Sequence, residues 1–289
     1  MKKFCIVASI LFFILSIFFL SLYIDENIKL KKDAEEFESL VENVVIEDVV
    51  STPDETPPSP PTTTVEDTTN VANESQPQTK PSVPHKVEYK TPAAIDIPAL
   101  SKINKDAAGW ICLENSPINY PILYSSGNEY LNKNIYGNYS YSGSIFTYDS
   151  QKFNSVEEMD KNIVIYGHNM NNGTMFSYIN TLFLTPEYLK NKKNEFIFIY
   201  NAEYIYKYRI YSVYKIDKKE NFNQVQFKDE TSFITFCKTT QKRSVYKGFE
   251  YNFKGDDHII TLSTCPSYNS KNQRVILHAI LVDTSKNIY

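Results

Sequence analysis

The 289-residue sequence has no excess of positive charge, and it contains only four cysteines, four histidines and eight glycines. Its formal net charge is -4 and no basic patch stands out, which argues against nucleic acid as a partner. The cysteines do not form the pattern of a disulfide framework, and no acidic cluster suited to a metal ion is visible. Tyrosine and phenylalanine are abundant instead, with 22 and 18 residues, which indicates an aromatic-rich β core.

The N-terminal segment, residues 1–24, contains a long apolar run. Two lysines precede the run, which covers residues 4–24, and Asp25 closes it. A run of about 20 residues at ~1.5 Å each spans a hydrocarbon core of ~30 Å. The lysines place the N-terminus in the cytoplasm and the rest of the chain outside. A cleaved signal peptide is the alternative, but the run is longer than usual for one and no small-x-small site follows.

Two segments of different character come next. Residues 25–50 place Leu30, Phe37 and Val44 at seven-residue spacing among charged residues, which predicts a helix just outside the membrane. Residues 51–94 are rich in Pro, Thr, Ser, Asn, Gln and Glu, and they keep no apolar period. Such a segment predicts a disordered, extended linker that carries the next domain away from the bilayer.

The folded domain is expected at residues 95–289. A short helix is predicted at 102–108, and a second one starts at Asp229 and places Phe233 and Cys237 at helical spacing. Many short strands indicate a mainly β barrel or sandwich with peripheral helices. The predicted strands are residues 110–113, 118–123, 143–148, 162–166, 196–201, 204–215, 259–265 and 274–282.

The run HIITLSTCPSYNSKNQR, residues 258–274, looks like a strand, a polar loop and the start of another strand. Alternation places Thr261, Ser263 and Cys265 on one face of the first strand. If the two strands pair as an antiparallel hairpin, Cys265 and Arg274 lie at the same edge of the sheet. The sequence thus brings a thiol and a guanidinium together.

A second stretch, residues 161–170, reads as an apolar strand that breaks at Gly167 and presents His168 in a polar loop. A thiol with a pKa of ~8.5 is mostly protonated at neutral pH, so a cysteine nucleophile needs a nearby imidazole or cation. His168, Cys265 and Arg274 are therefore a candidate catalytic set of acid/base, nucleophile and oxyanion stabiliser.

The remaining histidines of the predicted domain are weaker candidates. In the proposed hairpin His278 lies four residues beyond Arg274, or about 13 Å along the strand, which is too far for a hydrogen bond to a thiol at the edge. His258 lies further still from Cys265. Both are expected to be surface or packing residues.

The other cysteines have plain structural explanations. Cys5 falls within the apolar run, Cys112 in an apolar strand and Cys237 on an apolar helix face. Buried, unreactive thiols are the expectation for Cys112 and Cys237. A disulfide between them stays open, because nothing in the sequence determines the distance between the two.

Three motifs in order resemble those of the sortases, and of class B within that family. They are YGHNM at 166–170 with GTMF at 173–176, TLSTC at 261–265, and Arg274 nine residues after the cysteine. Looser matches lie at 106–111, 118–121 and 143–146. The resemblance covers roughly residue 95 to the C-terminus, and it implies an eight-stranded sortase barrel.

The resemblance also implies an activity. A cysteine transpeptidase of this family cleaves a C-terminal sorting motif of secreted proteins after Thr, through a thioester on Cys265, and His168 protonates the leaving amine. An amino group of the cell-wall peptide, or of a pilin, then takes the acyl group. No cofactor or metal is implied. Ser263 and Thr264 are expected to bind substrate, and the segment between residues 215 and 258 is expected to form a wall of the substrate groove.

The expected location follows from the anchor: a single-pass protein of a Gram-positive cell membrane, with its catalytic domain outside. Pro266 departs from some class B members at the residue after the cysteine, which leaves substrate preference open. Two alternatives also stay open. An extracellular Cys-His peptidase or peptidoglycan hydrolase would use the same dyad, although such enzymes usually place the cysteine before the histidine. A non-catalytic surface binding module would explain the anchor, linker and β domain but not the catalytic set.

Overall fold

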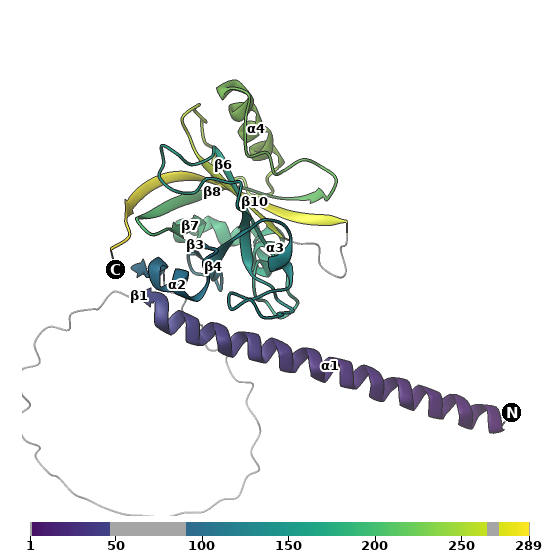
Figure 1. Ribbon diagram of the computed structural model, residues 1–289. Helices are drawn as coiled ribbons and strands as arrows, with labels where there is room; N and C mark the ends of the chain where they lie inside the picture. Colours follow the sequence, from purple (N-terminus) through teal and green to yellow (C-terminus); the bar gives the residue numbers. More distant parts are fainter. Residues whose placement is uncertain (1, 47–90, 265–271, 289) are drawn as a thin grey trace, which may run out of the picture. The chain divides into compact units, whose positions relative to one another are not determined.

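The computed structural model describes residues 2–46, 91–264 and 272–288 (Figure 1). Eight described strands close into a barrel in the order β10-β8-β7-β3-β4-β5-β6-β9. The barrel is mixed, because β4 and β5, and likewise β6 and β9, pair in parallel while the other neighbours are antiparallel. The strands are β3 (Ala107–Leu113), β4 (Asn119–Ser125), β5 (Ile145–Tyr148), β6 (Asn162–Gly167), β7 (Phe196–Tyr200), β8 (Tyr204–Asp217), β9 (Ile259–Thr264) and β10 (Gln273–Lys286).

Alternate residues of the strands fall into two buried clusters, as a period of two requires. One cluster fills the barrel and contains Ile165 of β6 and Leu262 of β9. Their neighbours Val164 and Tyr166 belong to the other cluster, on the outer side of the sheet. All strands predicted from the sequence lie within one or a few residues of observed ones, and the predicted eight-stranded barrel is confirmed.

Helix α2 (Ile97–Ile103) covers part of the outer side and buries Ile97 and Leu100. The helix predicted at 102–108 is therefore wrong, since α2 begins earlier and β3 begins at Ala107. The physical reason is the N-cap: the Asp96 carboxylate accepts a hydrogen bond from the Ala99 N–H at 2.8 Å, and a proline occupies the first turn.

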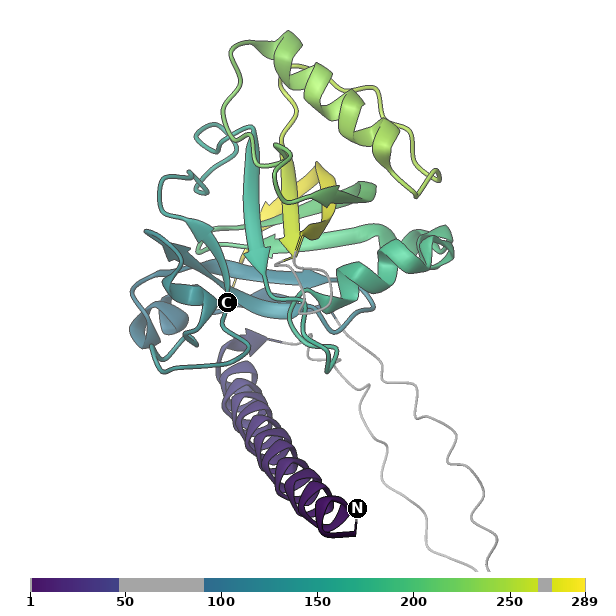
Figure 2. The same ribbon diagram turned by 90° about the vertical axis from the view of Figure 1, so that its right-hand side faces the viewer.

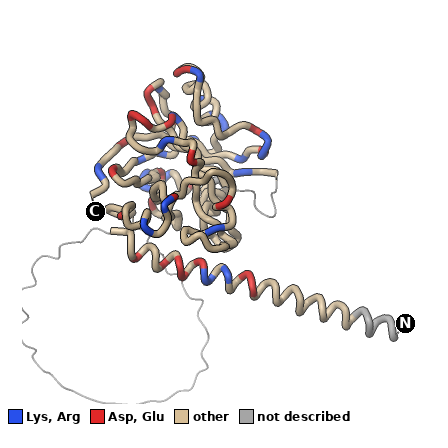
Figure 3. Tube along the Cα trace, viewed as in Figure 1, with Lys and Arg blue, Asp and Glu red and all other residues tan. Residues whose placement is uncertain are grey.

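Helix α1 (Lys2–Val44) runs through both N-terminal segments predicted from the sequence. It is long and apolar enough to cross a membrane, with a mean hydropathy of 1.9 in its best window. Charged residues colour only the later part of its tube in Figure 3. In this later part Leu40 and Val44 are buried in the cluster that contains Trp110 of β3 and Leu100 of α2. The C-terminal part of α1 therefore packs on the barrel.

A two-stranded sheet joins the end of α1 to the start of the barrel domain. Strand β1 (Val45–Ile46) pairs with β2 (Ala94–Ile95), in the register Val45 with Ile95 and Ile46 with Ala94. The predicted linker lies almost entirely outside the described residues. The pairing nevertheless places the residues that precede and follow positions 47–90 beside each other.

Helix α4 (Glu230–Arg243) confirms the helix predicted after Asp229, whose side chain accepts a hydrogen bond from the Ser232 N–H at 2.7 Å. Its Phe233 and Cys237 pack with Tyr211 of β8. Figure 2 shows α4 above the barrel strands, well separated from α3 (Ser177–Leu184). Short 3-10 turns complete the described chain at η1 (Glu129–Leu131), η2 (Pro186–Lys190) and η3 (Lys192–Glu195).

Candidate active site

The predicted catalytic histidine follows directly after β6, which ends at Gly167. A Cβ at Gly167 would meet the Ile145 side chain at 2.4 Å and the Phe176 ring at 2.8 Å. Only a glycine therefore allows β5 and the start of α3 to approach the end of β6 so closely. This packing brings the chain out of the sheet at His168, as the sequence predicted.

His168 is half-buried and held by two hydrogen bonds. Its Nε2 lies 2.7 Å from the Leu131 carbonyl oxygen. Because a carbonyl only accepts, Nε2 carries the proton of this bond. The His168 carbonyl in turn accepts from the Phe176 N–H at 2.8 Å, which closes the loop of residues 168–176 on itself. The ring is thus oriented with Nδ1 as the nitrogen available for proton exchange.

The same loop contains a strained residue. Met175 has a φ of 55°, in the left-handed region that residues with side chains rarely adopt. Its N–H donates to the Tyr120 hydroxyl of β4 at 3.1 Å, and it forms an isolated bridge with Asn169. Strain of this kind is kept where the surroundings over-determine the backbone, and here it shapes the loop that carries His168.

The strand before the predicted nucleophile runs beside the strand before the histidine. Strands β6 and β9 pair in parallel, and their last matched residues are Gly167 and Thr264. In the sequence, Gly167 is followed by His168 and Thr264 is followed by Cys265. Cys265 itself lies outside the described residues.

Arg274 reaches the same point from the neighbouring strand. Strand β10 pairs with β9 in antiparallel register, as predicted for the hairpin. The Arg274 guanidinium donates from one Nη to the Thr264 carbonyl oxygen at 3.4 Å and lies 5.7 Å from the centre of the Phe222 ring. Its buried Nε has no partner among the described residues. The Arg274 guanidinium therefore contacts Thr264, the residue that precedes Cys265 in the sequence.

The two residues predicted to bind substrate differ in their surroundings. Ser263 is fully buried, and its hydroxyl has no hydrogen-bond partner within the described part of the chain. The Thr264 hydroxyl accepts a hydrogen bond from the Val275 N–H at 3.0 Å and also borders a cavity. The Thr264 side chain thus ties the end of β9 to β10.

A polar cavity of about 430 Å³ lies at this edge of the barrel. It is bounded by the loop of residues 168–176, called the histidine loop below, by α3 and by the ends of β9 and β10. The lining residues are Asn169, Met170, Asn171, Gly173, Ser177, Asn180, Thr181, Lys215, Thr264, Gln273, Arg274 and Val275. The cavity thus adjoins both the loop of His168 and the guanidinium of Arg274.

The polar face of α3 was not predicted from the sequence. Ser177, Asn180 and Thr181 line the cavity, and the buried Ser177 hydroxyl has no partner among the described residues. The opposite face buries Ile179 and Leu182. Small polar residues at positions i, i+3 and i+4 beside a buried apolar face are the signal that predicts this arrangement.

The remaining candidates are packing residues, as expected. Burial raises the pKa of both the Cys112 and the Cys237 thiols to about 12, and both thiols are free. His278 is fully buried between Tyr214 and Thr261, and burial lowers its pKa to about 3. Burial also lowers the pKa of His258, whose ring contacts the Asp160 carbonyl.

Comparison with known proteins connects this geometry to a family. A family model for the sortase domain matches residues 113–282. The chain is 32% identical to Sortase B of Staphylococcus aureus over 65% of its own length and 75% of that protein. It is 33% identical to Sortase B of Listeria monocytogenes over 63% of its length and 72% of that protein.

Solved structures agree with the sequence comparisons. A Staphylococcus aureus sortase B-substrate complex matches with a TM-score of 0.58 and 28% identity, over 65% of this chain and 84% of the other. The Clostridium perfringens sortase B structure matches with a TM-score of 0.57 and 30% identity, over 64% of this chain and 99% of the other.

Proposed function

Because this chain belongs to the sortase family, and within it to the class B cysteine transpeptidases, we propose that it cleaves a C-terminal sorting motif of secreted proteins after Thr. The acyl group would pass through a thioester to an amino group of the cell-wall peptide or of a pilin. The observation that carries this proposal is the parallel pairing of Gly167 with Thr264. It supports a dyad in which His168 and Cys265 each follow one of the paired residues.

The proposed nucleophile is Cys265. Its thiolate attacks the carbonyl carbon of the motif threonine, the carbon–nitrogen bond breaks, and the leaving amine takes a proton from His168. The bond from His168 Nε2 to the Leu131 carbonyl leaves Nδ1 for this transfer. In the second half of the reaction an acceptor amine attacks the thioester carbon and the carbon–sulfur bond breaks. The now neutral His168 takes the proton that the amine gives up, and it returns the proton to the departing Cys265 sulfur.

Arg274 is proposed to stabilise the oxyanion that forms on the threonine carbonyl. Its contact with the Thr264 carbonyl and its unpartnered buried Nε support donors that face the place where charge develops. A guanidinium keeps its charge at all relevant pH values and offers several donors in a fixed plane. A role for Ser263 and Thr264 in substrate binding remains part of this proposal.

The polar cavity is the proposed site for substrate groups next to the scissile bond. The α3 residues Ser177, Asn180 and Thr181 supply hydrogen-bonding groups on one wall, and Arg274 lies on the other. A buried donor without a partner favours a substrate that satisfies it. Extended peptide backbone and small polar side chains are ligands of this kind.

We further propose that the apolar part of α1, within residues 1–24, is a single-pass anchor whose lysine-bearing end lies in the cytoplasm. Residues 25–50 then form the juxtamembrane segment, 51–94 a linker and 95–289 the catalytic domain, all outside the cell. The length and hydropathy of α1 support the anchor. This topology places the enzyme where exported proteins meet the cell wall.

The test uses the full chain in detergent micelles with a library of fluorogenic sorting peptides, with and without an added amine. Peptide cleavage that requires Cys265, together with amine adducts detected by mass spectrometry, is the expected result. Cys265→Ala should abolish both, whereas the matched change Cys237→Ala removes a buried thiol and should leave cleavage in place. Cleavage that survives Cys265→Ala would overturn the proposal.

A further inference from the structure

Three tyrosines lie exposed on one short segment between η1 and β5. Tyr136, Tyr139 and Tyr141 expose 42%, 69% and 47% of their surface. We call the segment that carries them, residues 132–143, the tyrosine hairpin. Tyrosine is an amphipathic side chain, with an apolar ring and a polar hydroxyl. A cluster of exposed tyrosines is therefore suited to a boundary between apolar and aqueous surroundings.

Backbone hydrogen bonds and a tight turn give the tyrosine hairpin a defined structure. Lys133 and Tyr139 form an antiparallel bridge. The Asn134 N–H donates to the Asn138 carbonyl at 2.9 Å, and Gly137 at the turn adopts a φ of 77°. These backbone bonds hold the shape of the segment that carries the tyrosines.

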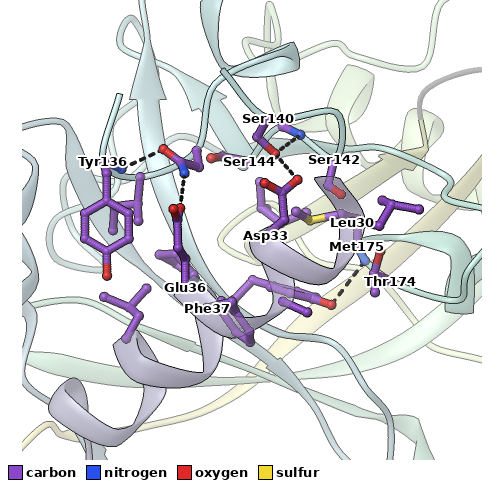
Figure 4. A pocket seen from close by; sticks show the side chains of 18 of the residues that line it. Leu30, Asp33, Glu36, Phe37, Tyr136, Ser140, Ser142, Ser144, Thr174 and Met175 are labelled. Atoms are coloured by element: carbon purple, nitrogen blue, oxygen red, sulfur yellow. Dashed lines mark hydrogen bonds between the residues drawn. The ribbon is translucent and has the colours of Figure 1, made fainter. Parts of the chain in front are cut away.

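Two side-chain hydrogen bonds fasten the tyrosine hairpin to α1. The Ser140 hydroxyl donates to the Asp33 carboxylate at 2.7 Å, and the Asn134 amide donates to the Glu36 carboxylate at 2.7 Å. Figure 4 shows Asp33 and Glu36 on the α1 side of a small cavity, with Ser140 and Tyr136 across from them.

The bond to Asp33 also brings two of the tyrosines to α1. Tyr139 and Tyr141 flank Ser140, whose hydroxyl donates to the Asp33 carboxylate. The backbone of these two tyrosines therefore lies beside the charged part of α1.

The rise per residue of α1 gives the distance from the apolar run to the hairpin. The run ends at Ile24, and Lys29 and Asp33 follow on the same unbroken helix. At 1.5 Å per residue, Lys29 stands roughly 7.5 Å and Asp33 roughly 13.5 Å beyond the run. The headgroup region is about 5–8 Å deep on each side of a bilayer, from the difference between its total and hydrocarbon thickness. Lys29 therefore lies at the level of the headgroups, and the backbone of Tyr139 and Tyr141, held beside Asp33, lies about one helical turn beyond it, a distance that a tyrosine side chain spans.

This distance does not depend on residues 47–90. The bonds from Asp33 and Glu36 attach α1 to the barrel domain directly, and β1 pairs with β2 on either side of that segment. The segment cannot lift the barrel away while α1 stays docked.

We propose that the tyrosine hairpin rests on the outer headgroup layer of the bilayer that α1 crosses, so that the partner of this surface is a phospholipid membrane. The inference rests on the proposed membrane anchor. Tyrosines gather at membrane interfaces because their rings are apolar and their hydroxyls remain hydrated. The contact also concerns the active site, since the Leu131 carbonyl that holds His168 precedes the hairpin by one residue.

The test places a fluorescent reporter on the hairpin of the full chain in vesicles of phosphatidylcholine and phosphatidylglycerol. Tyr139→Trp is the reporter, with Tyr141→Trp as a second position should the first variant misfold. The native Trp110 is fully buried, so the parent chain supplies a background to subtract. Val245→Trp is the matched control, because Val245 is also exposed and follows α4, which Figures 1 and 2 both draw across the barrel from α1.

We expect the tryptophan at 139 to shift its emission to the blue, to lose acrylamide quenching and to gain quenching by brominated lipid when detergent is exchanged for vesicles. The tryptophan at 245 should change in none of these. If the chain floats with the vesicles but both reporters behave alike, the hairpin contact is overturned and the anchor stands. If the chain does not float with the vesicles, the anchor is overturned together with the contact.

Discussion

Phe37 of α1 packs against Tyr120 of β4, with their ring centres 4.9 Å apart. The Tyr120 hydroxyl accepts the Met175 N–H at the strained point of the histidine loop. The Phe37 ring also stacks on Trp110 at 6.3 Å. This part of α1 thus supports the residue that shapes the loop of His168, and it is a structural part of the barrel domain.

Phe37→Ala should therefore weaken both the fold and the reaction. Deleting a partly buried aromatic ring costs about 2–3 kcal/mol, somewhat below the value for a fully buried one. We expect the free energy of unfolding in detergent micelles to fall by that amount and kcat to fall more than KM rises, because Tyr120 loses its support. Phe37→Leu should recover most of both.

The matched control is Glu42→Ala, an exposed change on the same helix that should alter stability by less than about 0.5 kcal/mol. Equal kcat values for Phe37→Ala and the native chain, at a temperature where both are folded, would show that α1 does not support the loop.

Residues 47–90 offer a second test, because β1 and β2 pair at their two ends. Replacing these residues by a four-residue Gly-Ser link shortens the connection roughly tenfold and should lower the cost of closing it by ~2 kcal/mol. We expect the free energy of unfolding to rise by up to that amount and peptide cleavage in micelles to stay unchanged.

The same shortened chain tests whether reach matters in the cell. Because the pairing of β1 with β2 holds the barrel beside α1 whatever connects the two strands, surface display of sorted proteins should persist together with cleavage in micelles. A drop in display with cleavage preserved would show that residues 47–90 act as a spacer. A loss of stability on shortening would instead contradict the simple closure argument.

Local patterns were sufficient to predict most of the fold. The strands carry period-two alternation and β-branched residues, and Asp229 is a strong N-cap, so these elements were predictable from short windows. Helix α2 was misplaced because its Asp96 cap was overlooked. Helix α3 was missed because it is short and its N-cap residue Phe176 makes no side-chain cap bond.

The site was predictable only in part, because some of its contacts join residues that are far apart in the sequence. The pairing of β9 with β10 is local in the sequence, and its antiparallel direction follows from the sequence. The parallel pairing that aligns Gly167 with Thr264 joins strands far apart in the chain, and only closure of the barrel produces it. The contact between α1 and the barrel is also non-local, so a heptad pattern shows that a partner exists without identifying it.

Arg274→Lys is the sharpest test of the oxyanion role. Lysine keeps the charge but loses the planar set of donors, so we expect kcat to fall by about 10²–10³, as for removal of one oxyanion donor, with a smaller change in KM. Arg243→Lys is the control, because Arg243 pairs with Glu220 at the surface, outside the residues that line the cavity. A similar kcat for the two variants would reject the role of Arg274 in the transition state.

His278 lies outside the proposed catalytic set and is held by hydrogen bonds on both ring nitrogens. The Thr261 hydroxyl donates to Asn162, so it accepts from His278 Nδ1, and Nε2 then accepts from the Tyr214 hydroxyl at 2.9 Å. The neutral ring is fully satisfied, and burial lowers its pKa to about 3.

In the unfolded chain the pKa of His278 returns to ~6.5, so the unfolded state binds more protons between these two values. Its share of stability is therefore complete above pH 6.5 and is lost as the pH falls, by ~1.4 kcal/mol per pH unit, or about 2 kcal/mol at pH 5. We expect His278→Gln to be less stable than the native chain at pH 7.5 but to show a shallower loss between pH 7 and pH 5 in denaturant titrations. His258→Gln, at a half-buried site, should change the slope less. Parallel stability profiles for His278→Gln and the native chain would mean that protonation of this buried imidazole does not set the acid limit of the fold.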